Sequence, residues 1–328
     1  MSASLLADAA LTTGFLPARL VAARMLAPDI RLLEFAPEGA ATFPPHEAGA
    51  HVDVLLAIRG QRAIRSYSLL GDGRDPSRYA IAVRRDPHGQ GGSAAMHALQ
   101  PGEVVPISAP RCHFPIALEA SAHRLIAGGI GITAILSLAT ALAEGRAPVS
   151  LHYAARTADR LVFRTALAAL VPDSHFYAGD RGERLDLARA LAAPRPAEAL
   201  YVCGPARMIE EARRLAPALG WPPGALRTEL FGTRDPAGDL PFTLRLARSG
   251  REVTVPPGRS IADVLIEVGL DPLLDCRRGE CGLCVAKVAG LQGEIEHRDR
   301  FFSEAEKAAG DRLCTCVSRA RGTLVLDL

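Results

Sequence analysis

A chain of 328 residues with a formal net charge of +2 is long enough for two or three domains and has no marked excess of basic residues. It contains no run of five basic residues, and its longest apolar stretches, such as 132–138, are far shorter than the ~18 residues of a membrane span. We therefore expect neither nucleic acid nor a membrane as a partner. Residues 1–20 do not read as a secretory signal, which predicts a cytoplasmic protein.

The first 120 residues alternate short β-like runs with turn residues. Pro, Gly and Asp separate runs rich in β-branched and apolar residues, a pattern typical of strands. The regular spacing of the runs predicts an antiparallel barrel. The predicted strands are 20–24, 30–35, 51–58, 66–70, 79–83 and 103–107.

The pattern changes at His123. An apolar run from Leu125 ends in the glycines of 128–131, and apolar residues then recur every three to four positions over 132–143, as in a helix. Alternating strands and helices predict a parallel sheet covered on both faces. The later elements predicted are strands 149–153, 175–178 and 199–203, and helices 158–170 and 207–215.

A Gly/Pro-rich segment, 231–241, resembles a linker. After it, two short strands around Ser249-Gly250 predict a hairpin, and Ser260 is placed to cap a helix that runs to Val268.

Five of the seven cysteines lie near the C-terminus. Cys276, Cys281 and Cys284 form a C-x4-C-x2-C pattern, and Cys314 and Cys316 follow. Plant-type ferredoxins hold a [2Fe–2S] cluster with this spacing and a distant fourth cysteine. A zinc site would normally show two short C-x2-C pairs, and disulfides are disfavoured by the odd number of cysteines. The pattern therefore indicates a protein that carries electrons.

Two motifs in the first block could bind a phosphorylated ligand. Arg65-Ser-Tyr67-Ser68 lies on a predicted strand, which places Arg65 and Tyr67 on one face and Ser68 on the other. The glycines before the predicted helix 94–99 would offer free backbone N–H groups to a phosphate. An exposed arginine and an ordinary helix N-cap are the alternative interpretations.

The α/β block carries two more motifs. Gly128-Gly-Ile-Gly131 joins the first strand to the first helix, where the pyrophosphate of a dinucleotide is expected. Cys203-Gly204-Pro205 ends a later strand at the sheet edge where ligands bind. A tight turn and a simple strand terminator are the alternatives.

These motifs occur in the same order in the phthalate dioxygenase reductase family, which the chain resembles over nearly its whole length. The family belongs to the ferredoxin-NADP reductase superfamily and includes vanillate O-demethylase reductases. The resemblance implies a multidomain fold: an antiparallel β-barrel flavin domain, an α/β parallel-sheet nucleotide domain and an α+β (β-grasp) ferredoxin domain. The implied boundaries are 1–118 for the FMN domain, 119–232 for the NAD domain, 233–241 for a linker and 242–328 for the ferredoxin.

The resemblance also implies roles for residues around the flavin. The family uses FMN, with Arg65 neutralising its phosphate, Tyr67 packing on the ribityl chain and ring, and Ser68 near the reactive N5. FAD is the alternative, because related reductases with the same motif bind it. The residues implied to hold the phosphate at the helix start are Gly91, Gly92 and Ser93.

A similar set is implied for the pyridine nucleotide. Arg156 and Arg160 lie near the expected adenosine ribose. NADH is the family's usual electron donor, but Arg160 is a candidate to accept the 2′-phosphate of NADPH. The choice between NADH and NADPH therefore stays open. Ala134 stands where the family commonly has proline. The residues implied to hold the pyrophosphate are Gly129, Gly131 and Thr133, those bordering the nicotinamide are Cys203, Gly204 and Pro205, and Phe231 is implied to lie against the flavin or nicotinamide.

The fourth cluster ligand has two candidates. Cys314 reproduces the spacing of plant ferredoxins, whereas Cys316 stands directly before Val317-Ser-Arg-Ala, where the reductase family has its ligand. We choose Cys316 because a strand cannot slip by one residue without turning its side chains to the opposite face.

The resemblance implies a reductase component of a Rieske-type oxygenase, a monomer that moves electrons from NADH through FMN and [2Fe–2S] to its partner. The alternatives are a standalone NAD(P)H-dependent reductase for another acceptor and a non-catalytic electron-transfer protein.

Overall fold

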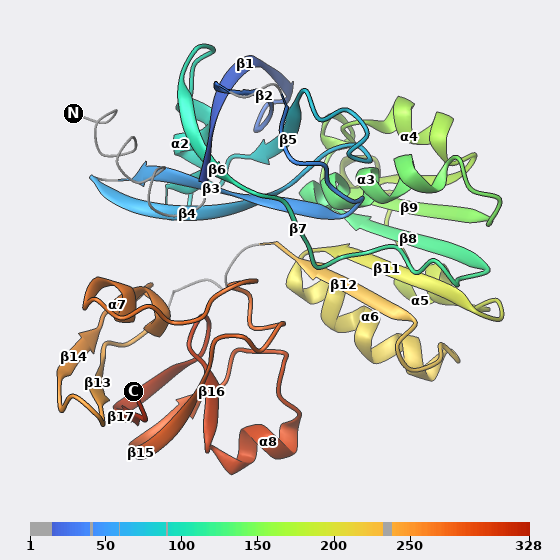
Figure 1. Cartoon of the computed structure of the whole chain (residues 1–328). Helices are drawn as coiled ribbons and strands as arrows, with labels where there is room; N and C mark the ends of the chain where they lie inside the picture. Colours follow the sequence, from blue (N-terminus) through green and yellow to red (C-terminus); the bar gives the residue numbers. More distant parts are fainter. Residues whose placement is uncertain (1–14, 40–41, 59, 90, 232–237) are drawn as a thin grey trace. The chain divides into compact units, whose positions relative to one another are not determined.

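The computed structural model describes residues 15–39, 42–58, 60–89, 91–231 and 238–328. They form two units, which divide between Phe231 and Gly232 (Figure 1). Most of the predicted linker, 233–241, falls outside the described residues, so the predicted domain boundaries stay predictions. No helix in the described part of the chain is long and apolar enough to cross a membrane.

The first sheet of the larger unit is antiparallel, with the strand order β4-β3-β6-β1-β2-β5 and β7 paired to β3. All six predicted strands are present, but the strand predicted at 66–70 ends at Ser68. Beyond it, the Leu70 N–H donates to Ala80 instead of continuing the ladder with β3. The elements are β1 (Phe15–Ala27), β2 (Ile30–Pro37), β3 (Ala50–Ile58), β4 (Gln61–Ser68), β5 (Tyr79–Arg84), α2 (Gly92–Ala98), β6 (Val104–Ser108) and β7 (Arg111–Cys112).

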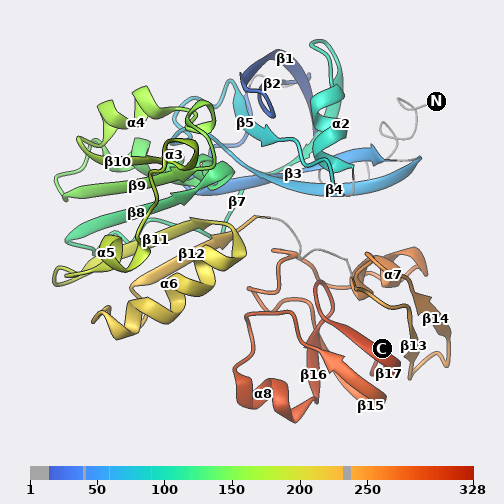
Figure 2. The ribbon, with the colours of Figure 1, turned by 180° about the vertical axis from the view of Figure 1, so that it is seen from behind.

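The second sheet of this unit is parallel, with the order β10-β9-β8-β11-β12. Helices α3 and α4 cover one face, and α5 and α6 cover the other (Figures 1 and 2). The elements are β8 (Ala122–Gly128), α3 (Ile132–Leu142), β9 (Val149–Ala155), α4 (Arg164–Leu170), β10 (Asp173–Ala178), α5 (Leu187–Leu191), β11 (Glu198–Gly204), α6 (Ala206–Ala218) and β12 (Leu226–Leu230).

The helix predicted at 158–170 is wrong in its first half. Only a 3-10 turn forms at 158–160, and α4 begins at Arg164 after Phe163, whose φ of 64° is left-handed. The buried Tyr153 hydroxyl donates to the Arg160 carbonyl at 2.9 Å, so this carbonyl bonds to a side chain and not to a helical N–H. Helix α5 and strand β12 were not predicted from the sequence.

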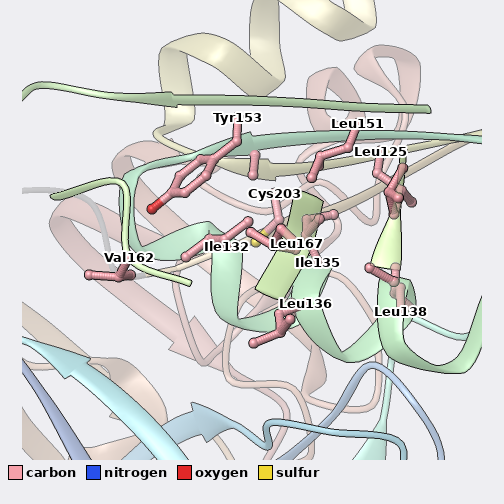
Figure 3. Close-up of a cluster of buried hydrophobic side chains, with 14 of the residues drawn as sticks. Leu125, Ile132, Ile135, Leu136, Leu138, Leu151, Tyr153, Val162, Leu167 and Cys203 are labelled. Atoms are coloured by element: carbon pink, nitrogen blue, oxygen red, sulfur yellow. The ribbon is translucent and has the colours of Figure 1, made fainter. Parts of the chain in front are cut away.

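Apolar side chains from β8, β9 and α3 form the largest core (Figure 3). Leu125, Leu151 and Ile135 are fully buried there, and the Cys203 thiol of β11 lies among them. On the other face, the single tryptophan, Trp221, donates its indole N–H to the Leu191 carbonyl at 2.8 Å.

The loops after β8 and β11 meet closely at the carboxyl edge of the parallel sheet. A Cβ on Gly131 would stand 2.2 Å from the Cys203 carbonyl oxygen, and one on Gly204 would stand 3.1 Å from the Gly128 backbone. The strand order reverses between β8 and β11, which makes this edge the usual ligand crevice of a parallel sheet.

The smaller unit is built on a mixed sheet, β14-β13-β17-β15-β16, in which β13 and β17 are parallel. The predicted hairpin and the Ser260 cap are both confirmed, and Ser260 forms a capping box with Asp263. Helix α8, which begins after Ser303, was not predicted. The elements are β13 (Phe242–Leu246), β14 (Glu252–Val255), α7 (Ile261–Glu267), β15 (Val285–Glu296), α8 (Glu304–Ala309), β16 (Arg312–Cys314) and β17 (Arg319–Leu326).

Gly131→Ala is expected to destabilise the larger unit by about 3 kcal/mol or more, because its Cβ would clash with backbone that cannot move aside. Denaturant unfolding followed by Trp221 fluorescence measures the change. The control is Gly145→Ala, at an exposed position after α3 where a Cβ meets only the Leu142 carbonyl at 3.2 Å; it should change stability by less than about 1 kcal/mol. Equal effects of the two substitutions would contradict the packing argument.

Candidate functional site

Two segments implied to bind the flavin phosphate lie against each other. Arg65 on β4 passes over the first residues of α2, where a Cβ on Gly92 would stand 2.8 Å from the Arg65 Cγ and Nε. Gly91 precedes it with a left-handed φ of 88°. A guanidinium and free backbone N–H groups therefore lie together, a donor set that fits a phosphate. The Ser93 hydroxyl also lies here and accepts from the Asp86 N–H at 3.0 Å.

Ser68, at the end of β4, is a second residue implied to lie along the flavin. Its side chain is buried, yet its Oγ has no hydrogen-bond partner in the described part of the chain. Since buried hydroxyls are nearly always paired, this one fits a site that a cofactor completes. Tyr67 packs against the core of the antiparallel sheet, and burial raises the pKa of its phenol.

Arg84, at the end of β5, links the two sheets of the unit. Its Nη1 lies 3.6 Å from the position that a Cβ on Gly129 would occupy. A positively charged side chain from the antiparallel sheet therefore lies beside the glycine turn 128–131, which is predicted to bind the pyrophosphate.

The predicted nucleotide residues lie together at the carboxyl edge of the parallel sheet. Thr133 is buried and its hydroxyl donates to the Ile130 carbonyl at 3.0 Å, so it supports the glycine turn from within. Pro205 is the N-cap of α6. The Cys203 thiol is fully buried in the core beneath this edge.

Sequence reasoning did not select Glu229 as a site residue. It pairs in register with Cys203 across β11 and β12 and is buried, with 2% of its surface exposed. Phe231 follows β12 and packs against the main core. A buried carboxylate at the ligand edge of a sheet is a candidate for function, and Glu229 lies two residues before Phe231, which was selected from the sequence.

The arginines after β9 differ in their surroundings. The Arg156 side chain is exposed to solvent. The Arg160 Nε donates to the Asp29 carboxylate at 2.8 Å, an ion pair that raises the pKa of the arginine.

In the smaller unit, backbone N–H groups of the loop at 276–284 surround the sulfur atom of Cys276. The backbone N–H groups of Arg278, Glu280 and Cys281 all point to the Cys276 Sγ at 3.4 Å. The neighbouring Cys316 thiol, together with these groups, lowers the pKa of Cys276 to about 4. Stabilised thiolates are the form that binds iron.

Glycines make this loop geometry possible. Gly279 and Gly282 have left-handed φ values of 71° and 74°. A Cβ on Gly279 would stand 2.5 Å from a Val317 methyl group, and one on Gly282 would stand 2.3 Å from the Phe301 ring. Only glycine fits either position without displacing its neighbours.

The two candidate fourth ligands occupy different positions. The Cys316 Sγ lies 3.1 Å from the Cys284 Sγ and also contacts Cys276. Cys314 is fully buried and contacts Cys284 at the end of β16. Cys281 is exposed. The donor set of four thiols fits a [2Fe–2S] cluster, and Cys316 as the fourth ligand stays a prediction.

Arg65 beside the start of α2, the glycine turn after β8 and the ferredoxin-like cysteine loop together indicate a flavin- and iron–sulfur-dependent oxidoreductase. The family model for the oxidoreductase FAD-binding domain matches residues 17–116, and that for the 2Fe-2S iron–sulfur cluster binding domain matches residues 244–321.

Comparison with whole proteins identifies the family. The chain is 39% identical over 315 residues to vanillate O-demethylase oxidoreductase of Pseudomonas sp., covering 94% of this chain and 98% of that protein. It is 36% identical to phthalate dioxygenase reductase of Burkholderia cepacia, with 96% and 98% covered. A solved structure of phthalate dioxygenase reductase superposes with a TM-score of 0.82 at 35% identity, covering 97% and 99%. The chain belongs to the phthalate dioxygenase reductase family.

Arg65→Ala should weaken flavin binding roughly ten- to a hundredfold, because a charge-assisted contact of ~1.5–3 kcal/mol is lost. Fluorescence titration of the flavin-free protein measures the affinity. Arg24→Ala, on an exposed position of β1, is the control and should leave it unchanged. Equal affinity of the Arg65 variant and the unmodified protein would overturn this role for Arg65.

Cys316→Ser should abolish the cluster and Cys314→Ser should retain it, because the Cys316 thiol contacts both Cys276 and Cys284, whereas the Cys314 thiol contacts Cys284. Iron content and the electron paramagnetic resonance spectrum of the dithionite-reduced protein distinguish the two variants. Loss of iron from the Cys314 variant alone would move the fourth ligand to Cys314.

Proposed function

We propose that this protein is the reductase component of a Rieske-type oxygenase that hydroxylates or O-demethylates an aromatic substrate. The observation that carries the proposal is the presence, in one chain, of a flavin cradle around Ser68 and Arg65 and a ferredoxin-type cysteine loop. A flavin accepts a two-electron hydride and an iron–sulfur cluster passes single electrons, so the pair converts NADH reduction into single-electron delivery.

We propose FMN as the flavin and NADH as the donor. A single phosphate cradle, formed by Arg65 with Gly91 and Gly92, supports FMN. The ion pair that occupies Arg160 supports NADH, because this arginine is then held away from a 2′-phosphate.

The side chains around the flavin position it and shield it. Arg65 holds the phosphate end, Tyr67 packs along the ribityl chain, and the Ser68 hydroxyl offers a hydrogen bond at the reactive edge. Phe231, after β12, covers the flavin or nicotinamide face, and the backbone of Gly129 and Gly131 holds the pyrophosphate. Arg156 lies toward the adenosine end.

The thiolates of the smaller unit complete the route. Cys276, Cys281, Cys284 and Cys316 hold the cluster, and the exposed Cys281 lies where electrons leave for the partner.

The partner class rests on the relatives. Their names are vanillate O-demethylase oxidoreductase, phthalate dioxygenase reductase and toluene-4-sulfonate monooxygenase system reductase subunit. A cytochrome P450 is the second candidate partner, because part of a self-sufficient P450 monooxygenase is similar to this chain. The two are 32% identical with a TM-score of 0.70, and the match covers 96% of this chain and 41% of the monooxygenase chain.

We further propose a monomer in the cytoplasm. Each redox site is built within one chain, which supports the monomer. None of the seven cysteines, all of which lie in the described part of the chain, forms a disulfide, which supports a reducing compartment.

A fragment that ends at Gly238 tests whether the larger unit alone transfers hydride from NADH to the flavin. It should keep its flavin, released as FMN on heating, and reduce a flavin-accepting dye with NADH, but fail to drive the oxygenase. The full chain should show flavin and [2Fe–2S] absorption bands that NADH bleaches, and should reduce a purified Rieske oxygenase.

The full chain with Cys276→Ser is the matched control, since it lacks the cluster without losing a domain and should behave as the fragment does. A folded, flavin-saturated fragment without dye activity would show that the smaller unit helps to build the flavin site. Reduction of a P450 haem but not of a Rieske oxygenase would correct the partner, and FAD in the heated extract would correct the flavin.

A further inference from the structure

The turn after β9 lies where the adenosine ribose of a dinucleotide is expected, beyond the carboxyl end of the sheet's second strand. Arg160 in this turn is the natural group to accept a 2′-phosphate. Its Nε instead donates to the Asp29 Oδ1 at 2.8 Å, with 30% and 26% of the two side chains exposed. Asp29 lies between β1 and β2 of the antiparallel sheet, and Arg160 follows β9 of the parallel sheet. The ion pair therefore joins the two sheets of the larger unit.

The backbone carbonyl groups of both Asp29 and Arg160 accept hydrogen bonds from neighbouring segments. The Asp29 carbonyl accepts from the Arg85 N–H at 2.7 Å, which fixes the β1–β2 turn to the end of β5. The Arg160 carbonyl accepts from the buried Tyr153 hydroxyl at 2.9 Å. The main chain is therefore fixed at both ends of the ion pair, which keeps the Arg160 and Asp29 side chains within reach of each other.

The rest of the turn carries negative charge. The Asp159 carboxylate accepts from the Thr157 hydroxyl, and the Asp180 Oδ1 accepts from the Ala158 N–H at 3.0 Å. Arg156 and Arg181, the residue after Asp180, are the cations next to these two carboxylates, and Arg160 and Asp29 neutralise each other. A 2′-phosphate brings about −1.5 to −2 charges at pH 7, whereas a 2′-hydroxyl brings none.

We propose that Asp29 sets the preference for NADH over NADPH by holding Arg160 in an ion pair. Asp29 acts as a positioning residue: it determines which nucleotide binds through the arginine it occupies. The inference rests on the proposed function, in that a pyridine nucleotide binds at the carboxyl edge of the parallel sheet.

Asp29→Asn keeps the size of the side chain and removes its charge. We expect the ratio of kcat/KM for NADPH to that for NADH, measured with a dye acceptor, to rise on the order of tenfold. Calorimetry on the full-length protein gives a readout that does not depend on turnover. The variant should bind 2′,5′-ADP roughly tenfold more tightly and 5′-ADP as the unmodified protein does.

Three further variants isolate the cause. Adding Arg160→Gln to Asp29→Asn should cancel the gain for NADPH, because the released cation is gone. Glu38→Gln breaks a comparable exposed pair with Arg19 on the same sheet and should leave the ratio unchanged. Asp29→Ser serves in place of Asp29→Asn if the latter folds poorly, as judged by flavin content and thermal unfolding.

A ratio unchanged within twofold in a folded Asp29 variant, or a gain that persists without Arg160, would overturn the inference. These results are separable from a failure of the proposed function, in which the unmodified protein would oxidise neither nucleotide and bind neither adenosine phosphate.

Discussion

The larger unit depends on the close approach of two loops at the carboxyl edge of its parallel sheet. Gly131 lies so near the Cys203 carbonyl, and Gly204 so near Gly128, that neither position has room for a side chain. This contact fixes the spacing of β8 and β11 at the point where the strand order reverses. The glycine turn after β8 and the Cys203-Gly204-Pro205 turn therefore pack against each other at one edge of the sheet.

The two sheets of that unit are joined by several polar contacts. The Ser137 hydroxyl on α3 accepts from the Gly49 N–H at 3.0 Å and donates to the Gly71 carbonyl. The Tyr201 hydroxyl on β11 accepts from the Ala117 N–H at 2.7 Å. Hydride transfer needs its two reactants held in close contact, so the side chains that join the two sheets would also set the position of a flavin relative to a nicotinamide.

The sequence predicted those parts of the fold and site that depend on local pattern. Ser260 was recognisable as a helix cap from its own neighbours, and the cysteine loop from its spacing. The helix at 158–170 was mispredicted because the deciding bond comes from Tyr153, on the preceding strand. Glu229 was passed over because its place beside Cys203 depends on strand register. The Asp29 and Arg160 pair joins residues 131 positions apart, which no local pattern reveals.

The position of Trp221 has a consequence for how the protein can be observed. It is the single tryptophan, and all five tyrosines, residues 67, 79, 153, 177 and 201, also lie in the larger unit. The smaller unit therefore has no intrinsic ultraviolet fluorophore beyond phenylalanine. Emission excited near 280 nm arises wholly from the flavin and nucleotide unit, while visible absorption by iron and sulfur arises wholly from the other. Intrinsic protein fluorescence thus reports on the fold of the larger unit alone, without any added label.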